Sequence, residues 1–136
     1  GSSGMRYLLD TCTVSDFVKG VPSVLEAITG RDPSHLGVSA ITRMEIDFGL
    51  ALNPARVQKW VAVLDDFFAV VPTIGFDVAD AEAAAALRAS LRREGRPIGA
   101  YDVMIAGTAL ARGLTVVTSN LGEFNRVSGL KVENWR

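Results

Sequence analysis

Short apolar runs alternate with helical patterns along this chain of 136 residues. The runs cover residues 7–9, 35–39, 67–74, 114–120 and 130–135. They are rich in β-branched and other apolar side chains, which predicts strands. The run at 114–120 is typical of a central strand in a parallel sheet, and the run at 130–135 of an edge strand.

The segments between these runs predict helices over residues 41–52, 54–68, 77–94 and 99–113. In the first of them, an apolar stripe at helical spacing is formed by Ile41, Met44, Phe48 and Leu52. We expect this stripe to face the protein. The segment 99–113 is apolar nearly all round, so it predicts a buried helix, and its small residues allow close approach to a neighbour.

Strands separated by helices predict βαβ units with right-handed crossovers and therefore a three-layer α/β/α domain. Residues 1–4 (GSSG) precede Met5 and have the composition of an expression-tag remnant. A single domain is therefore expected over residues 5–136. In such sheets, ligands bind at the carboxyl ends of the strands, near the switch in strand order.

Composition narrows the class of protein. Hydrophobic residues make up 49% and charged residues 21%, which predicts a soluble globular protein. No apolar run reaches the roughly 18 residues of a membrane span, and no secretory leader is visible, so a cytoplasmic location is expected. With one cysteine, Cys12, and one histidine, His35, neither an internal disulfide nor a Cys- or His-based metal centre is expected.

The net charge of −1 argues against a protein that binds nucleic acid through overall positive charge. Four arginines nevertheless fall within nine positions: Arg88, Arg92, Arg93 and Arg96. They form either a solvated helix end or a surface that faces phosphates.

Four acids occupy positions with a possible chemical role: Asp10, Glu45, Asp102 and Glu123. Each also has a local explanation. Asp10 follows the strand at 7–9 and precedes a helix, where it could act as a cap. Glu45 lies three residues after Thr42, as in a capping box, Asp102 suits the first turn of its helix, and Glu123 suits an exposed turn.

If these acids meet at one sheet edge, they raise one another's pKa values, and a divalent cation is the usual remedy. Oxygen ligands without His or Cys favour Mg²⁺ or Mn²⁺. Such ions serve phosphoryl chemistry. Thr11, Thr118 and Ser119 add hydroxyls that could orient a carboxylate or water, and Asn120 can offer a neutral oxygen.

Three segments together resemble the PIN-domain family, and within it the VapC-type toxins of bacterial toxin–antitoxin pairs. They are "LLDTCTVSDF", "SAITRMEIDFG" and "GRPIGAYDVMIAGTALARGLTVVTSNLGEFNRVSGLKVENW". The resemblance covers essentially the whole chain from Met5, and its most specific part runs from Gly95 to Trp135. It implies a Mg²⁺- or Mn²⁺-dependent endoribonuclease on a five-stranded parallel sheet.

Carried over by position, the resemblance gives Asp10, Glu45 and Asp102 as the first three catalytic acids and Glu123 as the fourth. Thr118 matches a small hydroxyl residue of the family, and Asn120 stands at an acid-bearing position. Relatives usually carry asparagine where this chain has Cys12, so the orientation of Asp10 is expected to be supported differently.

In the expected mechanism, one or two ions bridge Asp10, Asp102 and the scissile phosphate, and Glu45 and Glu123 hold water or a second ion. In-line attack by water leaves 5′-phosphate and 3′-hydroxyl ends. The resemblance implies single-stranded loops of tRNA or ribosomal RNA as targets, with inhibition of translation as the outcome. Phosphate contacts are expected from the arginines at 88–96 and from Arg43.

The family also implies an antitoxin that blocks the site, often with a basic side chain, and the apolar helices suit its groove or a homodimer face. Two other functions remain open. An aspartate-nucleophile phosphatase also places Asp after its first strand, but it requires a second acid where this chain has Cys12. A non-catalytic RNA- or protein-binding module on the same fold is expected to lack one of the four acids.

Overall fold

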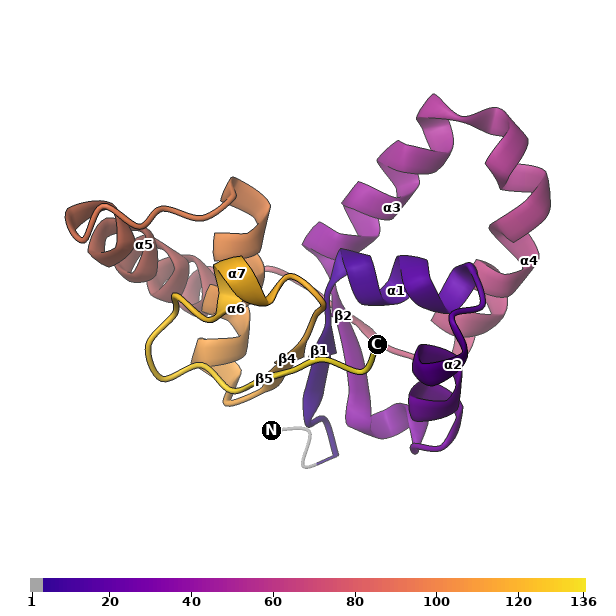
Figure 1. The fold of residues 1–136 in the computed structure, drawn as a ribbon, viewed down its shortest axis with the longest axis horizontal. Helices are drawn as coiled ribbons and strands as arrows, with labels where there is room; N and C mark the ends of the chain where they lie inside the picture. Colours follow the sequence, from indigo (N-terminus) through magenta and orange to yellow (C-terminus); the bar gives the residue numbers. More distant parts are fainter. Residues whose placement is uncertain (1–3) are drawn as a thin grey trace.

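The computed structural model describes residues 4–136, so the first three residues of the expected tag remnant lie outside the described part. Its centre is a parallel sheet in the order β3-β2-β1-β4-β5 (Figure 1). The strands are β1 (Tyr7–Leu9), β2 (Leu36–Ser39), β3 (Thr73–Ile74), β4 (Thr115–Val117) and β5 (Val132–Glu133). The predicted five-stranded parallel sheet is therefore confirmed. The domain boundary at residue 5 stays a prediction.

Helices cover both faces of the sheet (Figure 1). One side carries α1 (Thr11–Val18), α2 (Pro22–Thr29), α3 (Ala40–Leu52) and α4 (Pro54–Val70); the other carries α5 (Val78–Arg93), α6 (Ala100–Arg112) and α7 (Leu121–Phe124). A short 3₁₀ turn, η1 (Pro33–His35), precedes β2. The three layers match the predicted architecture. Within residues 4–136, no helix is both long and apolar enough to cross a membrane.

Strand alternation divides the buried side chains between two cores. Leu9 and Val117 join the core beneath α1, α2 and α4, whereas Leu8 and Val116 join the core beneath α5, α6 and α7. All four are fully buried. Successive strand residues point to opposite faces, so a strand covered on both faces must be apolar at every position. This explains the continuous apolar runs.

The prediction of a strand over 67–74 is wrong in its first half. Residues 67–70 complete helix α4, and β3 is confined to Thr73–Ile74. Leu64, Phe67 and Val71 are all buried in the same core. Their spacing of three and four residues is that of a helix face, so packing against this core outweighs the β-branched composition.

Beyond Ile41, which packs against the core beneath α5, α6 and α7, the apolar stripe of α3 faces solvent instead of the protein. The exposed fractions of Met44, Phe48 and Leu52 are 41%, 60% and 69%. Helix α3 packs through another apolar pair, Ile46 and Leu50, which lie against the core of α1, α2 and α4. The helix thus has two apolar faces, and the expected orientation of the stripe is confirmed for Ile41 and wrong for the other three residues.

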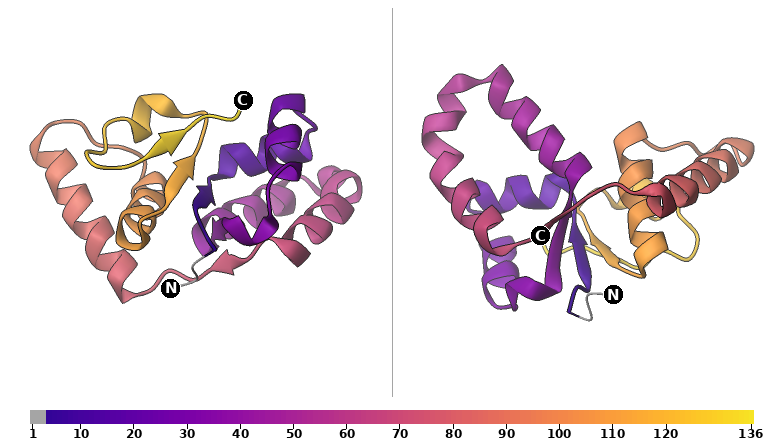
Figure 2. Two further views of the ribbon diagram at one scale, coloured as in Figure 1. Left: turned by 90° about the horizontal axis from the view of Figure 1, so that it is seen from below. Right: turned by 180° about the vertical axis from the view of Figure 1, so that it is seen from behind.

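Helices α5 and α6 approach each other closely, as Figure 2 shows from two further directions. A Cβ added at Gly107 would lie 2.6 Å from the Cα of Ala84, so only glycine allows this distance. The buried carboxylate of Asp80 binds Arg112, with Oδ2 2.8 Å from Nη2. The predicted close approach of the small-residue helix is confirmed.

Candidate active site

The carboxyl ends of β1 and β4 meet at the centre of the sheet, where the strand order switches direction. From β1 the chain continues to β2 and β3 on one side of β1. It then crosses to β4 and β5 on the other side. Leu9 pairs with Val117, which brings the next residues, Asp10 and Thr118, to the same edge. The Asp10 amide donates to the Val117 carbonyl at 3.1 Å. This is where open parallel sheets place ligands.

Asp10 both caps a helix and faces the other acids. Its Oδ1 accepts a hydrogen bond from the Thr13 amide at 2.9 Å, which makes it the N-cap of α1. The side chain is only 2% exposed. Burial raises its pKa, hydrogen bonds from Thr118 and Thr13 oppose this rise, and the negative charge of Glu45 adds to it. Asp10 is therefore both a helix cap and a member of the acid cluster.

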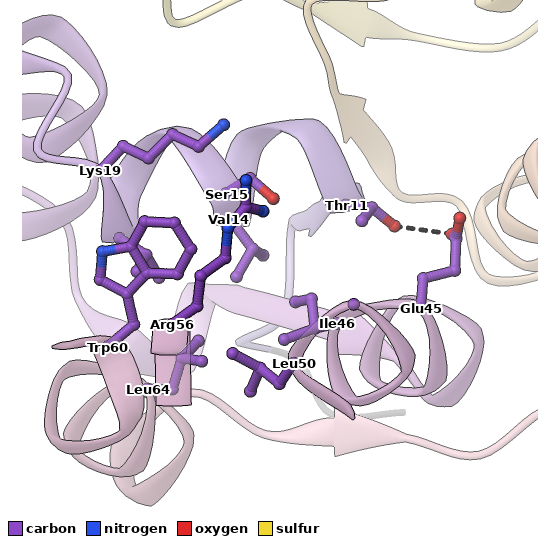
Figure 3. Close-up of a pocket in the computed structure, with 12 residues that line it drawn as sticks. Thr11, Val14, Ser15, Lys19, Glu45, Ile46, Leu50, Arg56, Trp60 and Leu64 are labelled. Carbon is purple, nitrogen blue, oxygen red and sulfur yellow. Dashed lines mark hydrogen bonds between the residues drawn. The ribbon is translucent and has the colours of Figure 1, made fainter. Parts of the chain in front are cut away.

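Glu45 reaches the same edge from the second turn of α3. The Thr11 hydroxyl donates to its Oε1 at 2.7 Å (Figure 3). The capping-box alternative for Glu45 is wrong, because α3 begins earlier: Ser39 is the N-cap and its hydroxyl accepts from the Ile41 amide at 3.1 Å. Thr11 thus orients a carboxylate, in agreement with one of its expected roles.

Asp102 and Glu123 form a second pair of acids, on α6 and α7. Asn120 joins them: its Nδ2 lies 3.0 Å from Glu123 Oε2 and 3.4 Å from Asp102 Oδ2. In this arrangement the amide nitrogen of Asn120 faces the acids, and the expected use of its oxygen stays a prediction. The backbone amide of Gly99 donates to Glu123 Oε1 at 3.1 Å.

The electrostatics of this pair indicate one shared proton. Burial raises the pKa of Asp102 to about 7, and a hydrogen bond to Glu123 and the charges of Glu123, Asp10 and Glu45 contribute. The pKa of Glu123 is lowered, first by its hydrogen bond with Asp102. At neutral pH, Asp102 therefore holds a proton part of the time and donates it to the Glu123 carboxylate.

Three other residues singled out in the sequence do not join the acids. Arg43 is engaged elsewhere on α3, with Nε 3.5 Å from Asp47 Oδ2 and its guanidinium stacked over Phe68. His35 ends η1 and precedes β2, so it lies at the opposite end of that strand from the site. Cys12 is exposed beside the acids; desolvation and the charges of Asp10 and other acids raise its pKa to about 11, which suppresses the thiolate.

The arginine cluster lies at the end of α5 that precedes α6. Its members are Arg88, Arg92, Arg93 and Arg96. The first three belong to α5, and Arg96 lies in the loop that leads to α6. All four are exposed.

Three residues with roles at the site were missed in the sequence. The amide of Thr13 donates to the capping carboxylate of Asp10, and its hydroxyl donates to the Val117 carbonyl at 2.8 Å, which joins α1 to β4. Thr42 is fully buried beside Thr11. Gly99 donates its backbone amide to Glu123 at the start of α6. The only available signals were hydroxyls beside Asp10 and Glu45 and a glycine three residues before Asp102.

A pocket extends from Glu45 along α1, α3 and α4 (Figure 3). Thr11 and Glu45 form its end at the acids, and Ile46, Leu50 and Trp60 are among its apolar lining residues. Two cationic side chains, Lys19 and Arg56, also line it. The pocket therefore joins the acid cluster to an apolar groove with positive charge along it.

The family model that matches this chain is that of the PIN domain, over residues 7–130. The chain is 36% identical to the tRNA(fMet)-specific endonuclease VapC of Salmonella typhimurium, covering 96% of this chain and 98% of the relative. It is 31% identical, over the same shares, to ribonuclease VapC2 of Haemophilus influenzae.

Solved structures agree with these relatives. The crystal structure of DNA-bound VapBC from Salmonella typhimurium matches with a TM-score of 0.89 and 36% identity, over 97% of this chain and 99% of that chain. VapBC2 from Rickettsia felis, bound to a DNA fragment from its promoter, matches with a TM-score of 0.85 and 29% identity, over 97% of this chain and all of that chain.

Proposed function

Because the chain belongs to the PIN domain family, we propose that it is a VapC-type endoribonuclease, the toxin of a toxin–antitoxin pair that inhibits translation. Relatives named as ribonucleases and similar to the whole chain support the activity. The observation that carries the proposal is the meeting of Asp10, Glu45, Asp102 and Glu123, from four separate segments, at the carboxyl edge of the sheet.

We propose Mg²⁺ or Mn²⁺ as the cofactor, with Asp10 and Asp102 as its protein ligands. The donor chemistry fits, since the charged groups of the cluster are carboxylates, the hard oxygen ligands that these ions prefer. The charge also fits, because the negative charges of Glu123, Asp10 and Glu45 raise the pKa of Asp102, and a divalent cation would offset them. Within residues 4–136, no three acid, histidine or cysteine side chains are grouped closely enough to hold an ion, so an ion held by Asp10 and Asp102 would take its other ligands from water and the substrate phosphate. A bound ion would stabilise negative charge on the scissile phosphate.

The other side chains of the site have separate proposed roles. Glu45 keeps Oε1 on the Thr11 hydroxyl, which leaves Oε2 to accept a proton from the attacking water. Glu123 is fixed by the Gly99 amide and by Asn120, so its position does not depend on the substrate. The buried edge around Asp10 limits water to the open side of the cluster.

The proposed substrate is a single-stranded loop of structured RNA, either tRNA or ribosomal RNA. A relative named for tRNA(fMet) supports a tRNA target. Cleavage by water is expected to leave 5′-phosphate and 3′-hydroxyl ends. The exposed arginines at 88–96 are the proposed phosphate contacts, whereas the engagement of Arg43 with Asp47 and Phe68 makes it a weaker candidate.

A cognate antitoxin is the proposed protein partner, supported by the VapBC complexes among the similar structures. The groove that begins at Glu45 suits the apolar tail of such a partner, with a basic side chain at the acids. The exposed stripe of Met44, Phe48 and Leu52 is the proposed homodimer face.

Cleavage of RNA by the purified protein and by Asp10→Asn tests the function. Asparagine retains N-cap ability, so the variant is expected to fold. With Mg²⁺ or Mn²⁺, the unmodified protein and the exposed-site control Asp65→Asn should cut tRNA, and Asp10→Asn or added chelator should abolish cutting. Equal cleavage by Asp10→Asn would refute the proposal. Uncut RNA in every arm would favour the non-catalytic module, and a trapped aspartyl-phosphate the phosphatase.

A further inference from the structure

A second hollow, of about 260 Å³, lies between the end of α5, the loop at 94–99 and the first turn of α6. We call it the α5–α6 pocket. Its apolar lining includes Leu91, Ile98 and Val103, and Arg88 and Arg92 also line it. An apolar cavity of about 150 Å³ is enough to hold benzene. The α5–α6 pocket is therefore large enough for a nucleobase ring.

The pocket lies directly beside the candidate active site. Val103 lines the pocket and the preceding residue, Asp102, belongs to the acid cluster. Successive residues on a helix are about 100° apart, so the two sites lie on adjacent faces of the first turn of α6. A chain whose phosphate lies at the acids can reach the pocket with a neighbouring nucleotide.

The loop that separates the two sites is held in place by hydrogen bonds. The Gly95 amide donates to the Arg92 carbonyl at 3.1 Å, and the Arg96 amide donates to the Leu91 carbonyl at 2.9 Å. With Gly95 at φ +68°, these bonds end α5 in a Schellman motif. Arg126 Nη1 donates to the Pro97 carbonyl at 2.8 Å. The same loop then supplies the Gly99 amide to Glu123. The pocket wall and one catalytic acid therefore share a rigid support.

Among the described residues, neither arginine of the pocket has a carboxylate as an ion-pair partner. Across residues 4–136, no carboxylate lies within 4.0 Å of the guanidinium nitrogens of Arg88 or Arg92. Both side chains are exposed. Unpaired guanidinium groups beside an apolar hollow suit a ligand with a flat ring and flanking negative charge.

Resting on the proposed function, we propose that the α5–α6 pocket binds one unstacked base of the RNA that is cut at the acids. Arg88 and Arg92 contact the phosphates on either side of that base. An acidic protein segment would satisfy the arginines, but it would leave the hollow beside Pro97 and Ile98 unfilled. RNA satisfies the hollow, the charge and the nearby phosphoryl site together.

The first test compares equal losses of charge inside and outside the pocket. Binding of a short end-labelled single-stranded RNA is measured by fluorescence anisotropy at low salt in the Asp10→Asn background. Arg88→Ala/Arg92→Ala should weaken binding about tenfold, and Arg93→Ala/Arg96→Ala, which does not alter the pocket lining, about two- to threefold. Equal losses would show general attraction and overturn the pocket. A poly-glutamate peptide that displaces RNA equally well would also overturn it, in favour of an acidic protein site.

The second test concerns the base. One abasic nucleotide is moved stepwise along the same RNA, and one position should weaken binding at least about fivefold. In Ile98→Ala, whose unfolding temperature is measured alongside, this penalty should shrink to less than about twofold. A wild-type pocket without any position-dependent penalty would overturn the proposal. Cleavage by the protein with Asp10 intact is scored separately, so failure of the nuclease function and failure of the pocket give different results.

Discussion

Replacing Asp102 by asparagine should stabilise the protein at alkaline pH, although it removes a proposed metal ligand. Burial and the neighbouring acids raise the pKa of Asp102 from 3.8 to about 7. The folded state thus holds this proton more tightly than the unfolded chain does. Between pH 4 and 7 the unfolded chain binds fewer protons, so the free energy of unfolding falls as pH rises. Asparagine retains the donor to Glu123 without titrating.

The size of the effect follows from the pKa difference of about three pH units. Each unit corresponds to about 1.4 kcal/mol, which gives an upper bound of about 4 kcal/mol. The lowered pKa of Glu123 offsets part of this, and solvent at the open side of the cluster screens another part. The quantity to compare is the free energy of unfolding of Asp102→Asn minus that of the wild type. We expect this difference to be about 1–3 kcal/mol more positive at pH 8 than at pH 4.

Urea unfolding in the presence of chelator at pH 4 and pH 8 measures this difference. Asp65→Asn, at an exposed position on α4, serves as the matched control and should follow the wild type. Added Mg²⁺ or Mn²⁺ should stabilise the wild type at pH 8, since a ligand that binds only the folded state raises the free energy of unfolding, and should stabilise Asp102→Asn less. A difference between Asp102→Asn and wild type that does not change with pH would refute the electrostatic reasoning.

Three further changes test the packing and the thiol. Gly107→Ala forces a Cβ to within 2.6 Å of the α5 backbone and should cost about 1–3 kcal/mol in urea unfolding, whereas Gly49→Ala, with nothing within 4 Å, should be neutral or stabilising. Arg112→Ala leaves the carboxylate of Asp80, 1% exposed, without its cation and should cost about 3–5 kcal/mol by the same assay; a loss below about 1 kcal/mol would contradict the buried pair. Alkylation of Cys12 by iodoacetamide with chelator at pH 8 should be about a hundredfold slower than that of a small thiol, because the pKa is about 11; an equal rate would contradict the raised pKa.

The strands next to the site could be predicted because both of their faces are buried. Leu8, Leu9, Val116 and Val117 have to be apolar whichever core they join, so the sequence shows them without knowledge of the packing. The position of Asp10 could be predicted as well, because it directly follows β1 and the carboxyl ends of parallel strands lie at one edge of the sheet. The tertiary partners of an apolar side chain carry no such signal.

Helices α3 and α4 show the consequence. On α3, the exposed stripe at Phe48 and the packed pair at Ile46 and Leu50 are similarly apolar, and only the neighbouring core decides which face is buried. At the end of α4, Phe67 and Val70 have side chains common in strands, yet the helix continues because Phe67 fills the core one turn after Leu64. Propensity is the weaker effect at both places.

The hydrogen bonds of the site were also beyond the sequence, and they divide the acids into two groups. Thr11 holds Glu45 on the α1–α3 side, whereas Gly99 and Asn120 hold Glu123 beside Asp102 on the α6–α7 side. Asp10 lies at the sheet edge and interacts electrostatically with both groups, as the causes of its raised pKa and of that of Asp102 show. A cation held by Asp10 and Asp102 would join the sheet edge to the α6–α7 side and would lessen the repulsion that both acids receive from Glu45 on the α1–α3 side. Metal binding is then expected to stabilise the whole domain, which is why unfolding and not cleavage alone is the informative measurement.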